Sequence, residues 1–145
     1  MEKIQIEMNE LVIFTYGDSL VDIDLNNLIN FALDANQPAI VTAVKPPMNY
    51  GFLKIRNNIV ESFDEKRTPE SSFISAGFFV LNRSKIFEYY SPSVDFEKSV
   101  LPILSSRNEL GAFIHLGNWA PMDNIFDKFK LDKLWKSGEA FWKNW

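Results

Sequence analysis

Two aspartates occupy positions at which carboxylates often do chemistry. Asp18 follows Gly17 after an apolar run, residues 11–16, and Asp123 stands directly before an amphipathic segment. Ligands of open α/β sheets bind just beyond the carboxyl ends of the strands, which makes Asp18 a candidate binding residue. Two such carboxylates at one sheet edge would suit Mg²⁺, which usually takes one or two carboxylates plus substrate phosphates. The structural alternatives are a turn aspartate at position 18 and a helix N-cap at position 123.

A second charged group, Glu65, Lys66 and Arg67, follows an expected strand. Lys66 could bind an anionic group such as a sugar phosphate, whereas the structural alternative is a solvated strand end. Other chemistries are excluded by composition, because the chain has no cysteine and His115 is its only histidine. A metal would therefore need oxygen ligands. The sequence also lacks the serine-hydrolase elbow, the dinucleotide-binding glycine motif and the Walker loop.

Length and composition predict one folded domain that binds neither membranes nor nucleic acid. The 145 residues are 46% hydrophobic with a net charge of −4, which is far from the composition of a disordered chain. The longest apolar run, residues 76–81, is well short of the ~18 residues that span a bilayer. No basic stripe is present to bind a phosphate backbone. The absence of cysteine and of a signal-peptide core favours a cytoplasmic location.

The elements that must position these side chains alternate between strands and helices. Short apolar runs predict buried strands, and apolar residues spaced by three and four predict helices. Alternating polar and apolar residues around Asn57 and Asn58 predict a hairpin of residues 52–55 and 59–63. The other expected strands are residues 11–16, 39–44, 72–81 and 110–115. The expected helices are residues 25–33, with Asp24 as N-cap, 83–90, 96–106 (with Pro102 as a weak point) and 123–138, with Gly138 as the terminating residue. Residues 1–145 should form a single α/β unit, a mixed, mostly parallel sheet with flanking helices and a small hairpin.

Longer motifs point to one family. Residues 14–18 read Phe-Thr-Tyr-Gly-Asp, residues 74–80 read Ile-Ser-Ala-Gly-Phe-Phe-Val, and residues 117–124 read Gly-Asn-Trp-Ala-Pro-Met-Asp-Asn. Between and after them stand Thr-Ala-Val-Lys-Pro-Pro at 42–47, Tyr-Gly at 50–51, Phe-Asp-Glu-Lys at 63–66 and a tryptophan-rich tail at 134–145. In order and content these motifs resemble the sugar-1-phosphate nucleotidylyltransferases, in particular the glucose-1-phosphate cytidylyltransferases. The resemblance implies an incomplete Rossmann-like nucleotidyltransferase fold.

The resemblance also implies a reaction and a metal site. In this family a phosphate oxygen of the sugar 1-phosphate attacks the α-phosphorus of a nucleoside triphosphate and expels pyrophosphate. For the cytidylyltransferases this transfers CMP from CTP to glucose 1-phosphate. Such chemistry depends on positioning and charge neutralisation, which the family supplies with Mg²⁺ and lysines. Carried over, Asp18 and Asp123 would bind the metal, and Asp18 and Lys66 would be the catalytic residues.

The same resemblance implies the substrate-binding residues. Lys66 would hold the sugar phosphate and Glu65 the sugar hydroxyls, while Gly51 and Gly77 would let the backbone approach the hexose closely. Thr42 and Ser75 complete the expected substrate site.

Two departures from the family pattern affect sugar recognition. Ser75-Ala76 replaces the family's Asn-Gly, and Arg67 replaces its usual proline. A site built around an amide loses discrimination when the hydrogen bonds of that amide go unmade.

A third departure concerns the extent of the chain. The family's Gly-Gly-x-Gly-Thr-Arg loop, which wraps the nucleotide phosphates, does not occur here, and only ten residues precede Leu11. The chain is therefore expected to be the C-terminal, sugar-phosphate and metal side of a nucleotidyltransferase domain, inactive unless a separate N-terminal half supplies the loop. The alternative is a truncated, non-catalytic homologue that acts as a binding or oligomerising module. In either case an exposed sheet edge would favour a homo-oligomer or partner capture.

Overall fold

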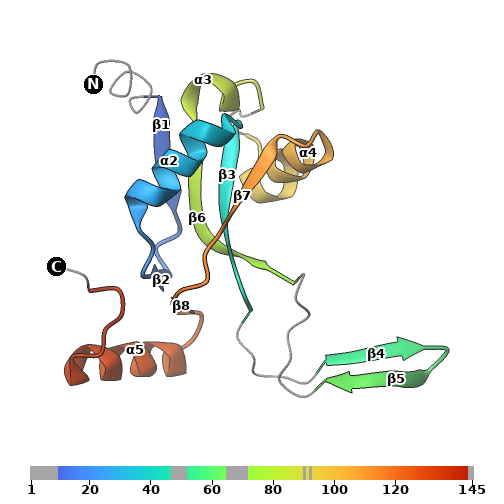
Figure 1. Ribbon diagram of the computed structural model, residues 1–145, viewed down its shortest axis with the longest axis vertical. Coiled ribbons are helices and arrows are strands. Elements are labelled where there is room, and N and C mark those ends of the chain that lie inside the picture. The colour runs from blue at the N-terminus through green and yellow to red at the C-terminus, as the bar shows by residue number, and fades with distance from the viewer. Residues whose placement is uncertain (1–9, 47–51, 65–71, 90, 92, 144–145) are drawn as a thin grey trace.

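The central element of the fold is a four-stranded sheet in the order β1-β6-β3-β7 (Figure 1). The computed structural model describes residues 10–46, 52–64, 72–89, 91 and 93–143. The strands β1 (Leu11–Thr15), β3 (Ala39–Val44) and β7 (Leu110–Ile114) run in one direction, and β6 (Ile74–Asn82) runs against them. The mixed sheet expected from the sequence is thus confirmed, with three strands sharing one direction.

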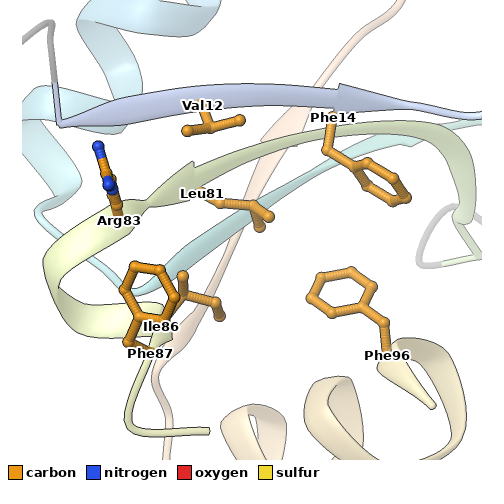
Figure 2. A pocket seen from close by; sticks show the side chains of 7 residues that line it. All are labelled: Val12, Phe14, Leu81, Arg83, Ile86, Phe87 and Phe96. Atoms are coloured by element: carbon orange, nitrogen blue, oxygen red, sulfur yellow. The ribbon is translucent and has the colours of Figure 1, made fainter. Parts of the chain in front are cut away.

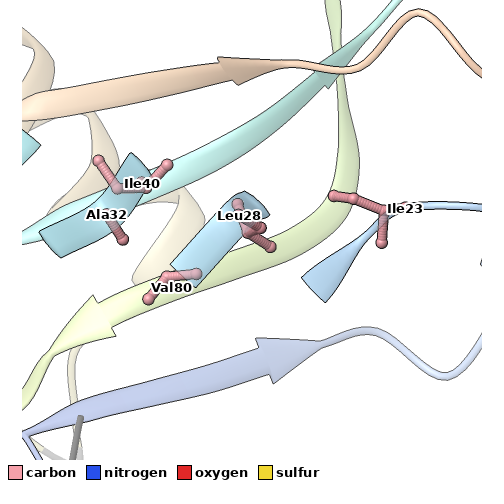
Figure 3. Close-up of a cluster of buried hydrophobic side chains, with 5 residues drawn as sticks. All are labelled: Ile23, Leu28, Ala32, Ile40 and Val80. Carbon is pink, nitrogen blue, oxygen red and sulfur yellow. The ribbon is translucent and has the colours of Figure 1, made fainter. Parts of the chain in front are cut away.

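One face of the sheet is covered by α2 (Leu25–Ala35). The helix begins at Asp24, the expected N-cap, whose carboxylate accepts hydrogen bonds from the amides of Asn26 and Asn27. Its buried side chains pack on apolar side chains of β3 and β6 (Figure 3). This cluster consists of Ile23, Leu28, Ala32, Ile40 and Val80.

The opposite face carries three short helical segments, α3 (Arg83–Ile86), the π-helical η1 (Phe96–Val100) and α4 (Leu101–Ser106). Their buried side chains meet Ala39, the strand neighbour of Ile40, in a second apolar cluster. Successive strand residues point to opposite faces, so Ile40 belongs to the first cluster and Ala39 to the second.

The expected helix over 96–106 changes from π to α geometry just before Pro102. This proline lies in the first turn of α4, where its missing N–H costs little. The expected helix over 83–90 is shorter and ends at Ile86.

A two-stranded ribbon extends beyond the carboxyl ends of β1 and β7. It pairs β2 (Ser19–Val21) antiparallel with β8 (Trp119–Pro121), joining segments about a hundred residues apart. In Figure 1 the ribbon lies below the sheet, at the end towards which β1 and β7 point. The two motifs that contain Asp18 and Asp123 are thereby brought together.

The expected hairpin is confirmed as β4 (Phe52–Arg56) and β5 (Ile59–Asp64), which project away from the main sheet (Figure 1). Both turn residues have positive φ, 48° at Asn57 and 64° at Asn58, a conformation that asparagine tolerates better than most residues.

The last helix, α5 (Ile125–Ser137), ends as expected at Gly138, which has a φ of 78°. Its N-cap is Asn124, whose side chain accepts hydrogen bonds from the amides of Phe126 and Asp127. The capping alternative for Asp123 is therefore wrong. Four apolar side chains of the helix are mostly exposed: Ile125, Phe126, Phe129 and Trp135. Among the described residues, no helix combines the length and apolar content needed to cross a membrane.

The β1 edge is apolar on both of its faces. Val12, Ile13 and Phe14 are each more than a third exposed. Beside this edge, on the η1 face, lies an apolar cavity of about 370 Å³ (Figure 2). It is lined by Val12, Phe14, Leu81, Arg83, Ile86, Phe87 and Phe96.

Candidate active site

The loop between β1 and β2 is hydrogen-bonded to Ala76 and Gly77 of β6. The amide of Tyr16 donates to the Gly77 carbonyl at 3.0 Å, and the Ser19 hydroxyl donates to the Ala76 carbonyl at 3.0 Å. Gly77 has a φ of 77°, and a Cβ there would lie 3.0 Å from Cδ2 of Tyr16. A glycine is thus needed for the loop to approach the strand this closely.

β8, the second strand of the ribbon, forms a hydrogen bond to the same part of β6. The indole Nε1 of Trp119 donates to the Ala76 carbonyl at 3.0 Å, so this oxygen accepts hydrogen bonds from both β2 and β8. On the other side of the loop, the Tyr16 hydroxyl donates to Oε1 of Glu97 at 2.7 Å. Burial and then the neighbouring Glu97 carboxylate raise the pKa of Tyr16, which keeps this phenol protonated as a donor.

Asp18 and Asp123 lie at the same end of the ribbon. Ser19 pairs with Pro121, and one step beyond this pair the Met122 amide donates to the Asp18 carbonyl at 2.7 Å. Asp123 is the next residue along the chain. The two positions were linked in sequence only by family resemblance, and the antiparallel pairing now gives a physical reason for their proximity.

Both aspartates are exposed, and neither carboxylate forms a hydrogen bond or ion pair with another residue in the described ranges. The described residues contain no group of three or more His, Cys, Asp or Glu side chains that could hold a metal ion. Two unengaged carboxylates with open solvent around them still fit a hard divalent cation, which completes its coordination with water and substrate phosphates.

The opposite end of the ribbon is held by Asp22. Its Oδ1 accepts from the Asn118 amide at 2.8 Å and lies 2.8 Å from Nε2 of His115, and its Oδ2 accepts from Nδ2 of Asn118 at 2.7 Å. Burial by itself would raise the pKa of the Asp22 carboxyl, but the hydrogen bonds from Asn118 and His115 outweigh burial and lower the pKa. We call Asp22, His115 and Asn118 the Asp22 clamp.

The other expected site residues have diverse surroundings. Ser75 lies in β6, and its hydroxyl accepts from the Gly77 amide at 3.2 Å, next to the ribbon. Thr42 is fully buried in β3, at an irregularity in the pairing with β6, and its Oγ1 has no partner among the described residues. Gly51, Glu65 and Lys66 lie outside the described residues. The structure therefore brings Asp18, Asp123, Ser75 and Gly77 to one region and leaves the sugar-phosphate side undescribed.

The sequence reasoning missed the Asp22 clamp and the shared Ala76 carbonyl. Asp22 stands four residues after Asp18 in a run with no recognisable spacing signal, and His115 was noted only as the single histidine. The only hint in the sequence is the glycine at position 117 of the 117–124 motif, and the structure gives its reason: a Cβ there would lie 2.4 Å from Oδ1 of Asp22.

Known proteins resemble this chain in sequence and in fold. The nucleotidyl transferase family model matches residues 2–133. Glucose-1-phosphate cytidylyltransferases of Salmonella typhimurium and Salmonella typhi are 41% and 40% identical over 137 residues, covering 94% of this chain and 53% of each relative. The crystal structure of HddC from Yersinia pseudotuberculosis superposes with a TM-score of 0.59 at 22% identity, over 87% of this chain and 56% of that one.

The chain spans about half the length of these curated relatives. Its mixed sheet with flanking helices agrees with the Rossmann-like fold of its structural neighbours. Because the family model matches most of the sequence, the chain belongs to the nucleotidyl transferase family.

Proposed function

We propose that this chain supplies the sugar-phosphate and metal side of an enzyme that transfers CMP from CTP to glucose 1-phosphate and releases pyrophosphate. The observation that carries the proposal is the β2–β8 ribbon, which brings Asp18 and Asp123 to one end beyond the carboxyl ends of β1 and β7. The substrates are those that the names of the Salmonella relatives state.

Asp18 and Asp123 would hold Mg²⁺, which supplies charge neutralisation at the reacting phosphates when bound. Asp18 and Lys66 are the proposed catalytic residues. We assign the Ser75 hydroxyl to the sugar side; it accepts from the Gly77 amide and keeps one O–H donor, whereas the side-chain amide of an asparagine has two. The proposed substrate-binding residues are Thr42, Gly51, Glu65, Lys66, Ser75 and Gly77.

The proposal includes a division of labour within the domain. This chain carries no glycine-rich phosphate loop of the family type, and phosphoryl chemistry depends on fixing the triphosphate in line with the attacking oxygen. We therefore expect the chain by itself to release no pyrophosphate, and expect activity when a second polypeptide supplies a nucleotide-binding half.

The metal site can be tested on the chain alone. Mn²⁺, a paramagnetic substitute for Mg²⁺, should broaden the backbone NMR signals of Asp18 and Asp123 selectively. Asp18→Asn and Asp123→Asn should each weaken this effect, whereas Asp132→Asn, an exposed aspartate on α5, serves as the matched control. Broadening that is equal in all four proteins would count against the metal site.

The reaction can be tested by complementation. The chain is incubated with CTP, glucose 1-phosphate and Mg²⁺, with and without the segment of the Salmonella typhimurium relative that it does not cover. Pyrophosphate release should require both polypeptides and should be lost in Asp18→Ala and Asp123→Ala. Turnover by the chain alone would refute the division of labour, and full activity of an aspartate variant would remove that residue from the site.

A second candidate function is a non-catalytic binding or oligomerising module. It is favoured by the exposed apolar β1 edge, with its adjoining cavity, and by the exposed apolar side chains of α5. Light scattering would detect the expected homo-oligomer, and substitutions of Ile13 and Phe129 by Asp would indicate which surface forms it. Oligomerisation without Mn²⁺ binding or complementation would favour this second function.

A further inference from the structure

The Asp22 clamp and the two candidate metal ligands lie at opposite ends of the same short ribbon. The ladder between them has three residue pairs, Ser19 with Pro121, Leu20 with Ala120 and Val21 with Trp119. A two-stranded ribbon of this length is marginal on its own, so its register must be fixed by other contacts. A slip of one residue would shift Asp123 relative to Asp18 by about 3.3 Å and turn its side chain to the other face.

Asp22 makes the contacts that fix this register. Its carboxylate accepts two hydrogen bonds from Asn118, the residue directly before β8, and its amide donates to the Asn118 carbonyl at 3.2 Å. The third member of the clamp, His115, directly follows β7, and its backbone amide donates to the carbonyl of Ala43 in β3. The clamp therefore ties the ribbon to the central sheet.

Gly117 shows how closely the clamp is fitted. A Cβ at this position would lie 2.4 Å from Oδ1 of Asp22 and 2.7 Å from both Cε1 and Nε2 of His115. The carboxylate thus occupies the space that a side chain at position 117 would need. At Gly17, beside Asp18, a Cβ would meet nothing within 4 Å.

We propose that Asp22 is a positioning residue that sets the register of β2 against β8 and so brings Asp123 to Asp18. This inference rests on the proposed function only for its consequence, metal binding. The register itself is a property of the described ribbon and can be measured without metal.

The register is reported by the Met122 amide, which donates to the Asp18 carbonyl at the far end of the ribbon. Asp22→Asn removes the negative charge that accepts these hydrogen bonds and places a side-chain NH₂ group opposite Nδ2 of Asn118. We therefore expect hydrogen exchange of the Met122 amide to accelerate by about tenfold or more. The Asn82 amide, which donates to the Pro38 carbonyl in the main sheet, should change little and reports global stability. Mn²⁺ affinity should fall by about tenfold as well.

Two further variants separate positioning from general destabilisation. Asp24→Ala removes another carboxylate that accepts two backbone amides, but at the N-cap of α2, and should leave Met122 exchange and Mn²⁺ affinity unchanged. Asp22→Asn combined with Asn118→Asp exchanges the two groups. The new amide at position 22 can then accept from the amide of residue 118 and donate to the new carboxylate, so most of the Met122 protection should return.

The outcomes distinguish the two proposals. Unchanged Met122 exchange in Asp22→Asn, or equal acceleration in Asp24→Ala, would overturn the positioning role. Accelerated exchange that is rescued by the double variant would establish the role even if the parent chain failed to bind Mn²⁺. That failure would refute the metal site of the proposed function and leave the register effect intact.

Discussion

The central sheet and the carboxyl-end ribbon are stabilised in different ways. In the sheet, Ile40, Phe79 and Val80 are at most 1% exposed and helices cover both faces. In the ribbon, every residue of both strands is only partly buried, and polar contacts from Asp22, Ser19 and Trp119 hold the strands in place.

This difference suggests how stability and site geometry are divided in the molecule. Apolar burial is non-directional and tolerates small shifts, whereas hydrogen bonds to a carboxylate fix distance and angle. We therefore expect substitutions in the sheet to act mainly on the free energy of unfolding, and substitutions in the ribbon to act mainly on the relation between Asp18 and Asp123.

The largest effect should come from the sheet. Phe79 is fully buried, and its ring centroid lies 5.9 Å from Phe14, 5.8 Å from Tyr16 and 5.5 Å from Phe96. Phe79→Ala should lower the free energy of unfolding by about 3–5 kcal/mol, because it removes apolar burial and leaves a cavity. Urea unfolding followed by circular dichroism measures this loss. A loss below about 1 kcal/mol would mean that the sheet does not depend on its apolar core as described.

The next effect should come from the Asp22 clamp and should depend on pH. Asp22→Asn should lower the free energy of local opening at the Met122 amide by about 1.5–3 kcal/mol at pH 7, the range for hydrogen bonds to a charged group. The pKa of Asp22 is lowered in the folded state, so its contribution is present above the unfolded value of about 3.9 and is lost as pH falls through the folded value. The difference in hydrogen-exchange protection of the Met122 amide between parent and variant should therefore shrink below about pH 4. A difference that grew on acidification would contradict this sign.

Much of the fold could be predicted from the sequence because its signals are local. The Asp24 cap, the Asn57-Asn58 turn and the Gly138 helix end each depend on a few neighbouring residues. The apolar runs of β1, β3, β6 and β7 likewise identified the strands of the sheet. Helix ends are less certain: the N-cap of α5 is Asn124, one residue beyond Asp123, where the helix was expected to begin.

The candidate site could be predicted only in part, because its contacts are long-range. Asp18 and Asp123 were identified by family motifs, and no spacing rule joins residues 105 positions apart. Asp22 and Asn118 are 96 residues apart, and their contact depends on the pairing of β2 with β8. This pairing depends on the fold as a whole and has no local sequence signal. The Asp22 clamp could therefore not be predicted, although Gly117 is visible in the motif at 117–124.

Two glycines allow a direct comparison of the sheet with the ribbon. In Gly117→Ala the new Cβ would meet the hydrogen-bonded Asp22 carboxylate at 2.4 Å, and in Gly111→Ala it would meet Cδ1 of Ile40 at the same distance. The isoleucine methyl can rotate away, whereas the carboxylate can move only by breaking the clamp. From hydrogen exchange, we expect Gly117→Ala to lower the free energy of opening at the Met122 amide by about 1–3 kcal/mol, and Gly111→Ala to lower that at the Asn82 amide by less than about 1 kcal/mol. A larger loss for Gly111→Ala would show that the sheet is the less tolerant region.

A smaller effect than that of the clamp should come from Asp24, at the junction of ribbon and sheet. Its carboxylate accepts from the Asn26 amide at 2.8 Å and the Asn27 amide at 3.3 Å. Asp24→Ala should cost about 1 kcal/mol in urea unfolding, the usual effect of losing an N-cap. Hydrogen exchange should accelerate at Asn26 and not at Met122, because α2 packs on the sheet and Met122 is held from the ribbon. Acceleration at both amides would mean that ribbon and sheet open together, and the distinction between the two regions would fail.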